Sequence, residues 1–336
     1  MPVPDTLAAE LAPILQAVTL RSPTALALAG SEVEAPDPQA ALAQLQQWLY
    51  QRCYVRRLAD GPPPAIQPQA DPAFLQALAA ANASHERWDR GWLLAQMLPN
   101  GQVVAQRGGL TRVLWPGEFL THEGPGAAPR VGAALSIFCP REAPSSQTGF
   151  YFAYGETTGD QQDYADVLRL YWNISAAGAP TLVAGVTAAL NRFRVPFRLK
   201  CGIAPDRFER IDAAVLYVSR RFYRVVAELL RDVLDALRPH LAPDTPLFTL
   251  RLAPGFALAE DPGTGESFGM HRCRILAEGF VAAHQRGAED EQARLEAIAA
   301  QFERHRLDIR RPYLGPGAAD IYEPLAALFS GREAAQ

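Results

Sequence analysis

Two spacings of apolar residues alternate along this chain, and each predicts a different kind of element. The clearest helical spacing covers 219–240, where apolar residues recur at steps of three and four until Pro239. The same period in weaker form predicts further helices, so the first sixty residues read as helical. These further helices are expected at 7–18, 39–54, 72–83, 181–193, 268–286 and 289–306. The segment 61–72, GPPPAIQPQADP, is expected to be a loop because proline and glycine interrupt regular elements.

Alternation with a period of two predicts strands between these helices. The alternating segments are 91–98, 101–107, 111–117, 131–138, 148–155, 166–174, 196–202, 212–220 and 246–252. Strands and helices follow one another without a regular βαβ rhythm, which favours an α+β fold over a doubly wound sheet. We expect a mixed, mainly antiparallel sheet packed by helices in residues 146–336. Residues 1–145 are expected to form a helical and β-hairpin region, either separate or part of one compact unit.

Composition narrows the class of protein. The chain has 336 residues, 49% of them hydrophobic, and a formal net charge of −4. That balance provides no overall basic field for nucleic acid and no polybasic tail for a membrane, and no apolar run is long enough to span one. The four cysteines are scattered without CxxC spacing. We therefore expect a cytoplasmic protein with reduced thiols, and neither a metal ion nor a cofactor.

The most unusual feature of the composition is a single lysine. Lys200 is the one lysine among thirty-two basic side chains, and the other thirty-one are arginines. A primary amine can lose its proton near neutral pH when it is desolvated or crowded by cations, whereas a guanidinium stays charged. Lys200 is therefore a candidate base or nucleophile, although a surface lysine retained by chance is the plainer alternative.

Several predicted strands carry cations opposite their apolar face. Arg169, Arg198, Lys200 and Arg251 all occupy such positions. If the strands share one sheet, these side chains form a cationic face suited to a phosphate or carboxylate ligand, because arginine binds oxyanions through paired hydrogen bonds. The alternative is an ordinary solvated outer face.

The helix expected at 268–286 begins in a way that also suits an anion. Ser267 is a candidate N-cap, yet His271, Arg272 and Arg274 follow within two turns, where cations oppose the helix dipole. A bound anion would resolve this conflict, and the alternative is that the three side chains point to water. Gly265–Gly269 matches GxSxG, but a loop precedes it instead of a strand, so a serine hydrolase using Ser267 is the less favoured interpretation. A Walker A motif is absent.

Two blocks of the C-terminal half carry a resemblance to a known family. FRLKCGIAPDRFERIDAAVLYVSRRFY, followed by PLFTLRLAPGFALAEDPGTGESFGMHRCRILAEG, resembles the HopA-type type III effector family. The segments LQQWLYQRCYVRR and RWDRGWLLAQMLPNGQVVAQRGG are similar to it as well, so the resemblance extends over about residues 10 to 315. One departure is visible, because Leu250 stands where the family pattern has a lysine after the FT of PLFT. Arg251, the next residue, could supply the missing cation.

The resemblance implies an enzyme, since free-standing bacterial relatives act as lyases in class V lanthipeptide and thioamitide biosynthesis. A partner kinase phosphorylates a precursor peptide, and the lyase eliminates phosphate from phosphothreonine or phosphoserine to leave a dehydroamino acid. In this chain the implied base is Lys200 and the implied general acid is His271. The residues implied to bind phosphate or orient the peptide are Arg198, Arg210, Asp212, Arg251, Glu260, Ser267 and Arg272. A phosphopeptide-binding or effector-type interaction module without chemistry is the alternative, and the sequence does not indicate an oligomeric state.

Overall fold

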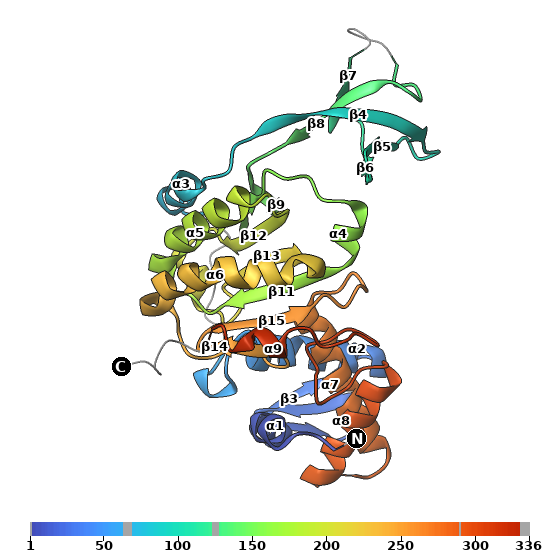
Figure 1. The fold of residues 1–336 in the computed structure, drawn as a ribbon. Coiled ribbons are helices and arrows are strands. Elements are labelled where there is room, and N and C mark those ends of the chain that lie inside the picture. Colours follow the sequence, from blue (N-terminus) through green and yellow to red (C-terminus); the bar gives the residue numbers. More distant parts are fainter. Residues whose placement is uncertain (1, 63–68, 123–127, 289, 330–336) are drawn as a thin grey trace.

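The computed structural model describes residues 2–62, 69–122, 128–288 and 290–329. Its fold is α+β, as predicted, and its strands pair antiparallel in three sheets. The largest sheet has seven strands (Figure 1). In spatial order they are β14 (Leu250–Ala253), β15 (Phe256–Glu260), β11 (Val167–Trp172), β13 (Ala214–Ser219), β12 (Phe197–Gly202), β10 (Phe150–Tyr154) and β9 (Glu142–Gln147).

Helices cover both faces of this central sheet (Figure 1). On one face lie α5 (Ala179–Arg192) and α6 (Tyr223–Leu237), which pack against each other and against the fully buried Leu168, Leu199 and Leu216. The other face meets a helical layer from both ends of the chain. That layer contains α1 (Asp5–Ala17), α2 (Pro38–Leu49), the π-helical turn η1 (Tyr50–Tyr54), α7 (Phe268–Gln285) and α8 (Glu291–Arg304).

Smaller elements complete this part of the molecule. The remaining helices are α3 (Pro72–Ala81), α4 (Gln161–Ala165) and α9 (Glu323–Ala326). The 3-10 turns are η2 (Leu58–Asp60), η3 (Ala176–Gly178), η4 (Pro205–Phe208), η5 (Arg220–Phe222) and η6 (Arg238–His240). The three-stranded sheet consists of β1 (Val18–Leu20), β2 (Ala25–Leu28) and β3 (Ser31–Glu34). No helix in the described part of the chain is long and apolar enough to cross a membrane.

The third sheet projects away from the central sheet (Figure 1). Its five strands lie in the order β6 (Leu110–Leu114), β5 (Val103–Arg107), β4 (Arg87–Met97), β8 (Ala134–Cys139) and β7 (Phe119–Thr121). This projecting sheet has a small apolar core of its own, which includes Trp92, Leu94 and Leu135. The main core instead combines residues from both ends of the chain, such as Leu11 with Ile298. The expected division near residue 145 remains a prediction.

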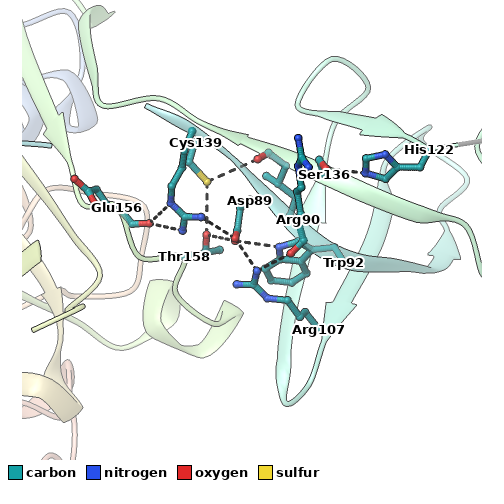
Figure 2. A network of polar contacts seen from close by, with 11 residues as sticks. Asp89, Arg90, Trp92, Arg107, His122, Ser136, Cys139, Glu156 and Thr158 are labelled. Carbon is teal, nitrogen blue, oxygen red and sulfur yellow. Dashed lines mark hydrogen bonds and ion pairs between the residues drawn. The ribbon is translucent and has the colours of Figure 1, made fainter. Parts of the chain in front are cut away.

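A buried carboxylate fixes the base of the projecting sheet. Asp89 on β4 accepts hydrogen bonds from Arg107 Nη1 at 2.6 Å, Thr158 Oγ1 at 2.8 Å, Arg87 Nη1 at 2.9 Å and Trp92 Nε1 at 3.0 Å (Figure 2). Burial alone would raise the pKa of Asp89, but these hydrogen bonds outweigh it and lower the pKa to about 2. Since Thr158 lies in the loop that follows β10, the network joins the projecting sheet to the central one.

Several strands occupy segments where the sequence predicts none. Residues 18–34, part of the first sixty residues expected to be helical, contain β1, β2 and β3, strands of only three or four residues each. The expected loops 139–147 and 253–267 contain β9 and β15. All five residues of β15 are buried, so this strand shows no alternation that could reveal it. Part of the loop expected at 61–72, residues 63–68, lies outside the described residues.

Candidate functional site

A cavity of about 390 Å³ lies on the face of the central sheet opposite α5 and α6. Strands β11, β12 and β13 form its floor, η1 and the start of α7 form its walls, and Phe150 of β10 borders it. The residues that line it are Tyr50, Tyr54, Gln147, Phe150, Arg169, Tyr171, Lys200, Arg210, Asp212, Ala213, Val215, Tyr217, Gly265, Glu266, Ser267 and Gly269. We call it the lysine cavity.

Strand register explains why these side chains meet. Arg169 is the direct partner of Tyr217, and Tyr217 is the direct partner of Arg198. Two residues further along each strand, Tyr171 and Lys200 both pair with Val215. Direct partners in antiparallel strands point to the same side, so the two rows share one face. Carboxylates also lie here, because Asp212 lines the cavity, so the cationic character expected for this face remains a prediction.

Lys200 lies in this cavity without a charged partner in contact. Its Nζ is 3.6 Å from the centre of the Phe150 ring, and no hydrogen bond or ion pair joins it to another described residue. The pKa of Lys200 is lowered to about 8, mainly by burial; Asp212 opposes this shift, and Arg210 and Arg169 contribute to it. The amine is therefore neutral in a substantial fraction of molecules near physiological pH.

Arg210 is a permanent cation beside this amine. Its Nε and Nη2 donate to the two oxygens of Asp212 at 2.8 and 3.0 Å, and Nη2 also donates to Tyr50 Oη at 2.9 Å. Burial alone would lower the pKa of Arg210, but Asp212 and Tyr50 outweigh it and raise the pKa. The paired contact fixes the plane of the guanidinium, which is the geometry needed to present further N–H groups to an oxyanion.

Arg169 completes the charged groups of the cavity floor. Its guanidinium donates to Asp261, with Nε 2.8 Å from Oδ2, and lies 5.3 Å from the centre of the Tyr217 ring. Asp261 Oδ1 also accepts from the backbone N–H of Gly263 at 2.9 Å. The arginine is thereby joined to the loop that leads into α7.

The start of α7 points its backbone at the cavity. Ser267 is the N-cap, as predicted, and its Oγ accepts from the N–H of Met270 at 3.3 Å. No hydrogen bond to another described residue uses the N–H groups of Phe268 and Gly269. A Cβ at Gly269 would lie 2.4 Å from the Tyr54 ring, so only glycine allows the helix this close. Free N–H groups at the positive end of an 18-residue helix form a site for an anion.

Two tyrosines with buried hydroxyls, Tyr54 and Tyr171, line the same cavity. Neither Tyr54 Oη nor Tyr171 Oη has a hydrogen-bond partner of good geometry among the described residues, but the two hydroxyls lie close enough for each to affect the pKa of the other. Burial raises the pKa of both, so each keeps its proton and can donate a hydrogen bond. The cavity therefore combines a titrating amine, a fixed guanidinium, free backbone N–H groups and two protonated phenols.

Four of the residues expected in the site lie together in this cavity: Lys200, Arg210, Asp212 and Ser267. Arg198 lies on the other side of Tyr217 and lines a second cavity. His271 and Arg272 are buried behind the start of α7 and do not line the lysine cavity.

The contacts of His271 and Arg272 explain their position. Arg272 donates to the carbonyl oxygens of Pro312 and Leu314 at 2.7 and 2.8 Å, and its Nη1 lies 2.6 Å from His271 Nδ1. Burial, with a further contribution from Arg272 and Arg274, lowers the pKa of His271 to about 4. In this arrangement the pair holds the C-terminal segment against α7, and the roles of general acid and phosphate ligand remain predictions without geometric support.

Glu260 and Arg251 also lie away from the cavity. Glu260 is buried and accepts hydrogen bonds from Gly315 N and Tyr322 Oη, each at 2.7 Å. Arg251 is exposed on β14, the edge strand. Sequence reasoning missed Tyr50 and Tyr54, which reach the site from a π-helical turn far away in the chain and carry no local signal of their role. The described residues contain no cluster of three or more histidine, cysteine, aspartate or glutamate side chains that could hold a metal ion.

Comparison with known proteins agrees with the resemblance found in the sequence. The model of the HopA1 effector protein family matches residues 141–314, more than half of the chain. The chain belongs to this family. The matched region includes β9 to α8, and with them Lys200, Arg210 and the start of α7. No curated protein matches the chain.

Two solved structures with a similar chain course are effector proteins of Pseudomonas syringae. The effector from pv. tomato strain DC3000 has 15% sequence identity and a TM-score of 0.48, with 92% of this chain and 96% of that chain covered. The effector from pv. syringae strain 61 has 16% identity and a TM-score of 0.41, with 81% and 96% covered.

Proposed function

We propose that this HopA1-family protein is a phosphothreonine/phosphoserine lyase that acts on a kinase-phosphorylated precursor peptide. The observation that carries the proposal is Lys200, the single lysine, whose pKa is lowered to about 8 inside a cavity that also holds Arg210 and the free N–H groups of α7. A β-elimination needs a neutral base near a site for the departing phosphate. The lysine cavity offers both within one space.

The reaction follows from these groups. The neutral Nζ of Lys200 takes the Cα proton of the phosphorylated residue, and the C–H electron pair forms the Cα=Cβ double bond. The Cβ–O bond breaks, and phosphate leaves with the electron pair of that bond. Phosphothreonine gives dehydrobutyrine and phosphoserine gives dehydroalanine. Arg210 and the N–H groups of Phe268 and Gly269 hold the phosphate charge, and the hydroxyls of Tyr54 and Tyr171 donate to developing charge or to the leaving group.

The other readings of the sequence have less support. Ser267 Oγ caps α7, and among the described residues no histidine contacts it, so the cavity has no activated serine for hydrolysis. A phosphopeptide-binding module would need only fixed cations, whereas the lowered pKa of Lys200 weakens the charge attraction that such a module uses. We further propose a protein kinase as the partner that supplies the substrate, and the cytoplasm, where ATP is available, as the place of reaction.

The test is to incubate the protein with a phosphothreonine peptide and to follow loss of H3PO4 by mass. The wild type is expected to produce the dehydrobutyrine peptide. Lys200→Arg keeps a cation but removes the titrating amine, and Lys200→Met removes both, so both variants are expected to lose the reaction. Arg224→Gln, which changes an exposed arginine on α6 across the sheet, is the matched control. Binding of the peptide without loss of phosphate would favour the interaction module, and an active Lys200→Arg variant would remove the base from the mechanism.

A further inference from the structure

A second cavity, of about 410 Å³, lies between the projecting sheet and the central sheet. Phe138 and Cys139 of β8 line one side, and Arg198 of β12 and Tyr217 of β13 line the other. Helix α4 contributes Tyr164. We call this space the inter-sheet cavity. The site assigned above does not use it.

Tyr217 borders both cavities. Arg169 lies 5.3 Å from the centre of its ring, and Arg198 lies 5.1 Å from it. Arg198 and Lys200 are two residues apart on β12, so their positions are separated by about 7 Å along the strand face. Each residue of an extended peptide advances about 3.3 Å. A peptide with its phosphorylated residue at Lys200 therefore reaches Arg198 and the inter-sheet cavity within about two to four residues.

The charges of the inter-sheet cavity favour an acidic occupant. Neither Arg198 nor Arg112 has an ion pair with a described residue; Arg198 stacks on Tyr217, and Arg112 donates to Tyr164 Oη at 2.9 Å. Two carboxylates also line the space. Asp163 is neutralised by Arg221, whose Nε lies 2.6 Å from its Oδ1.

The second carboxylate, Glu118, accepts from the backbone N–H of Trp115 at 2.8 Å and offsets part of the positive charge. The balance remains positive, with both arginine head groups open to further hydrogen bonds. Aromatic rings of Tyr154, Tyr164 and Phe138 form apolar walls between the charges. Such a lining suits a peptide segment with carboxylate side chains more than it suits a basic or a purely apolar segment.

The hydrogen-bond network at the base of the projecting sheet holds the walls of this space in place. Thr158 and Cys139 both line the cavity. Thr158 Oγ1 lies 3.6 Å from Cys139 Sγ and donates to the buried Asp89 at 2.8 Å (Figure 2). Arg87 on β4 donates through Nη1 to Asp89 and through Nε to the carbonyl oxygen of Glu156, at 2.9 Å in each case. The cavity is thereby already formed before a ligand enters, which reduces the ordering cost of binding.

We propose that the inter-sheet cavity binds an acidic segment of the substrate peptide, two to four residues from the phosphorylated residue, through Arg198 and Arg112. This inference rests on the proposed function for the position of the phosphorylated residue. Binding of the acidic segment itself does not require elimination, so it can be measured without turnover.

The experiment uses fluorescein-labelled phosphothreonine peptides that carry two glutamates, or two glutamines, at the second and third positions before or after the phosphothreonine. Affinities are measured by fluorescence anisotropy with the Lys200→Arg variant, so that elimination does not consume the peptide. In one of the two placements the glutamate peptide is expected to bind about three- to ten-fold more tightly than its glutamine counterpart. Arg198→Gln or Arg112→Gln, made in the same background, is expected to remove most of that preference. Arg224→Gln is expected to keep it.

Unphosphorylated versions of the same peptides separate this proposal from the proposed function. A glutamate preference that depends on Arg198 in these peptides supports the inter-sheet cavity even if the wild type eliminates no phosphate, an outcome that would contradict the lyase alone. Equal affinities of glutamate and glutamine peptides in both placements would overturn the acidic-segment proposal. A preference that survives both arginine variants would overturn it as well, whatever the outcome of the elimination assay.

Discussion

The titration of Lys200 is the prediction that tests the candidate site most directly. The pKa of this amine is lowered from 10.5 to about 8, which corresponds to about 3 kcal/mol of preference for the neutral form. At pH 7, an ordinary lysine is neutral in about one molecule in 3,000, whereas Lys200 would be neutral in about one molecule in ten. The negative charge of Asp212 raises this pKa, so replacement of Asp212 by asparagine is expected to lower the pKa below 8.

Because the chain contains one lysine, the assay is unusually simple. Protein grown with lysine labelled by ¹³C at the ε carbon gives a single lysine signal in an NMR spectrum, and its chemical shift is followed from neutral to strongly alkaline pH. Wild type is expected to titrate near pH 8, and Asp212→Asn at a lower pH. If the lyase activity is found, the rising limb of its pH–rate profile is expected to shift in the same direction.

Asp235→Asn is the matched control for this titration. Asp235 is exposed on α6, on the opposite side of the sheet, and pairs with Arg238 at 2.8 Å, so its loss is expected to leave the Lys200 signal unchanged. A wild-type pKa near 10.5 would refute the claim that burial and the two arginines control this amine. A rise of the Lys200 pKa in Asp212→Asn would refute the assigned sign of the Asp212 interaction.

Three further predictions concern stability. Lys200→Met is expected to raise the free energy of unfolding by up to about 3 kcal/mol at pH 7, measured by urea unfolding. The folded-state pKa of Lys200 is lowered, so burial of the charged amine destabilises wild type at pH 7. Wild type regains this stability only as pH rises from about 8 toward 10.5. Asp89→Asn is expected to lower the free energy of unfolding by about 2 kcal/mol near neutral pH, because the pKa of Asp89 is lowered from 3.8 to about 2. The stability that this shift provides is present above pH ~4 and is lost as pH falls toward 2, so the difference between variant and wild type should shrink in acid. Gly269→Ala is expected to lower stability by about 1–3 kcal/mol and to weaken phosphopeptide binding, because the added Cβ would meet the Tyr54 ring. Gly109→Ala is the control: a Cβ there has nothing within 4 Å, so this variant should lower neither thermal stability nor affinity by a comparable amount.

How far the sequence predicts this fold depends on which strands have one polar face. Strands β11 and β12 alternate clearly, because their apolar side chains enter the core and their polar ones face the cavities, so both are found from the pattern. Strand β15 lies between β14 and β11 and is buried on both faces, which erases the alternation. The strands β1, β2 and β3 are only three or four residues long, too short for a period to stand out.

The candidate site divides in the same way. Lys200, Arg210 and Asp212 lie close in the chain and on one side of the sheet, so local reasoning places them together. His271 and Arg272, expected with them because they lie close to Ser267 in the chain, do not line the cavity. Each helical residue turns about 100° from the last, and the side chain of Arg272 faces the C-terminal segment instead. A sequence pattern gives a helix start, but only tertiary packing decides which of its side chains reach the cavity.

The chemistry of the cavity depends on how burial acts on two kinds of cation. Burial lowers the pKa of both Lys200 and Arg210, since it disfavours any charged form. Arg210 stays charged because Asp212 and Tyr50 engage it directly, whereas the Lys200 amine lies against the Phe150 ring and has no hydrogen bond or ion pair to a described residue. The same environment therefore yields a permanent charge that can hold phosphate and an amine that can accept a proton. A second lysine in place of Arg210 would blur that difference, because its single charge centre cannot reproduce the paired contact with Asp212.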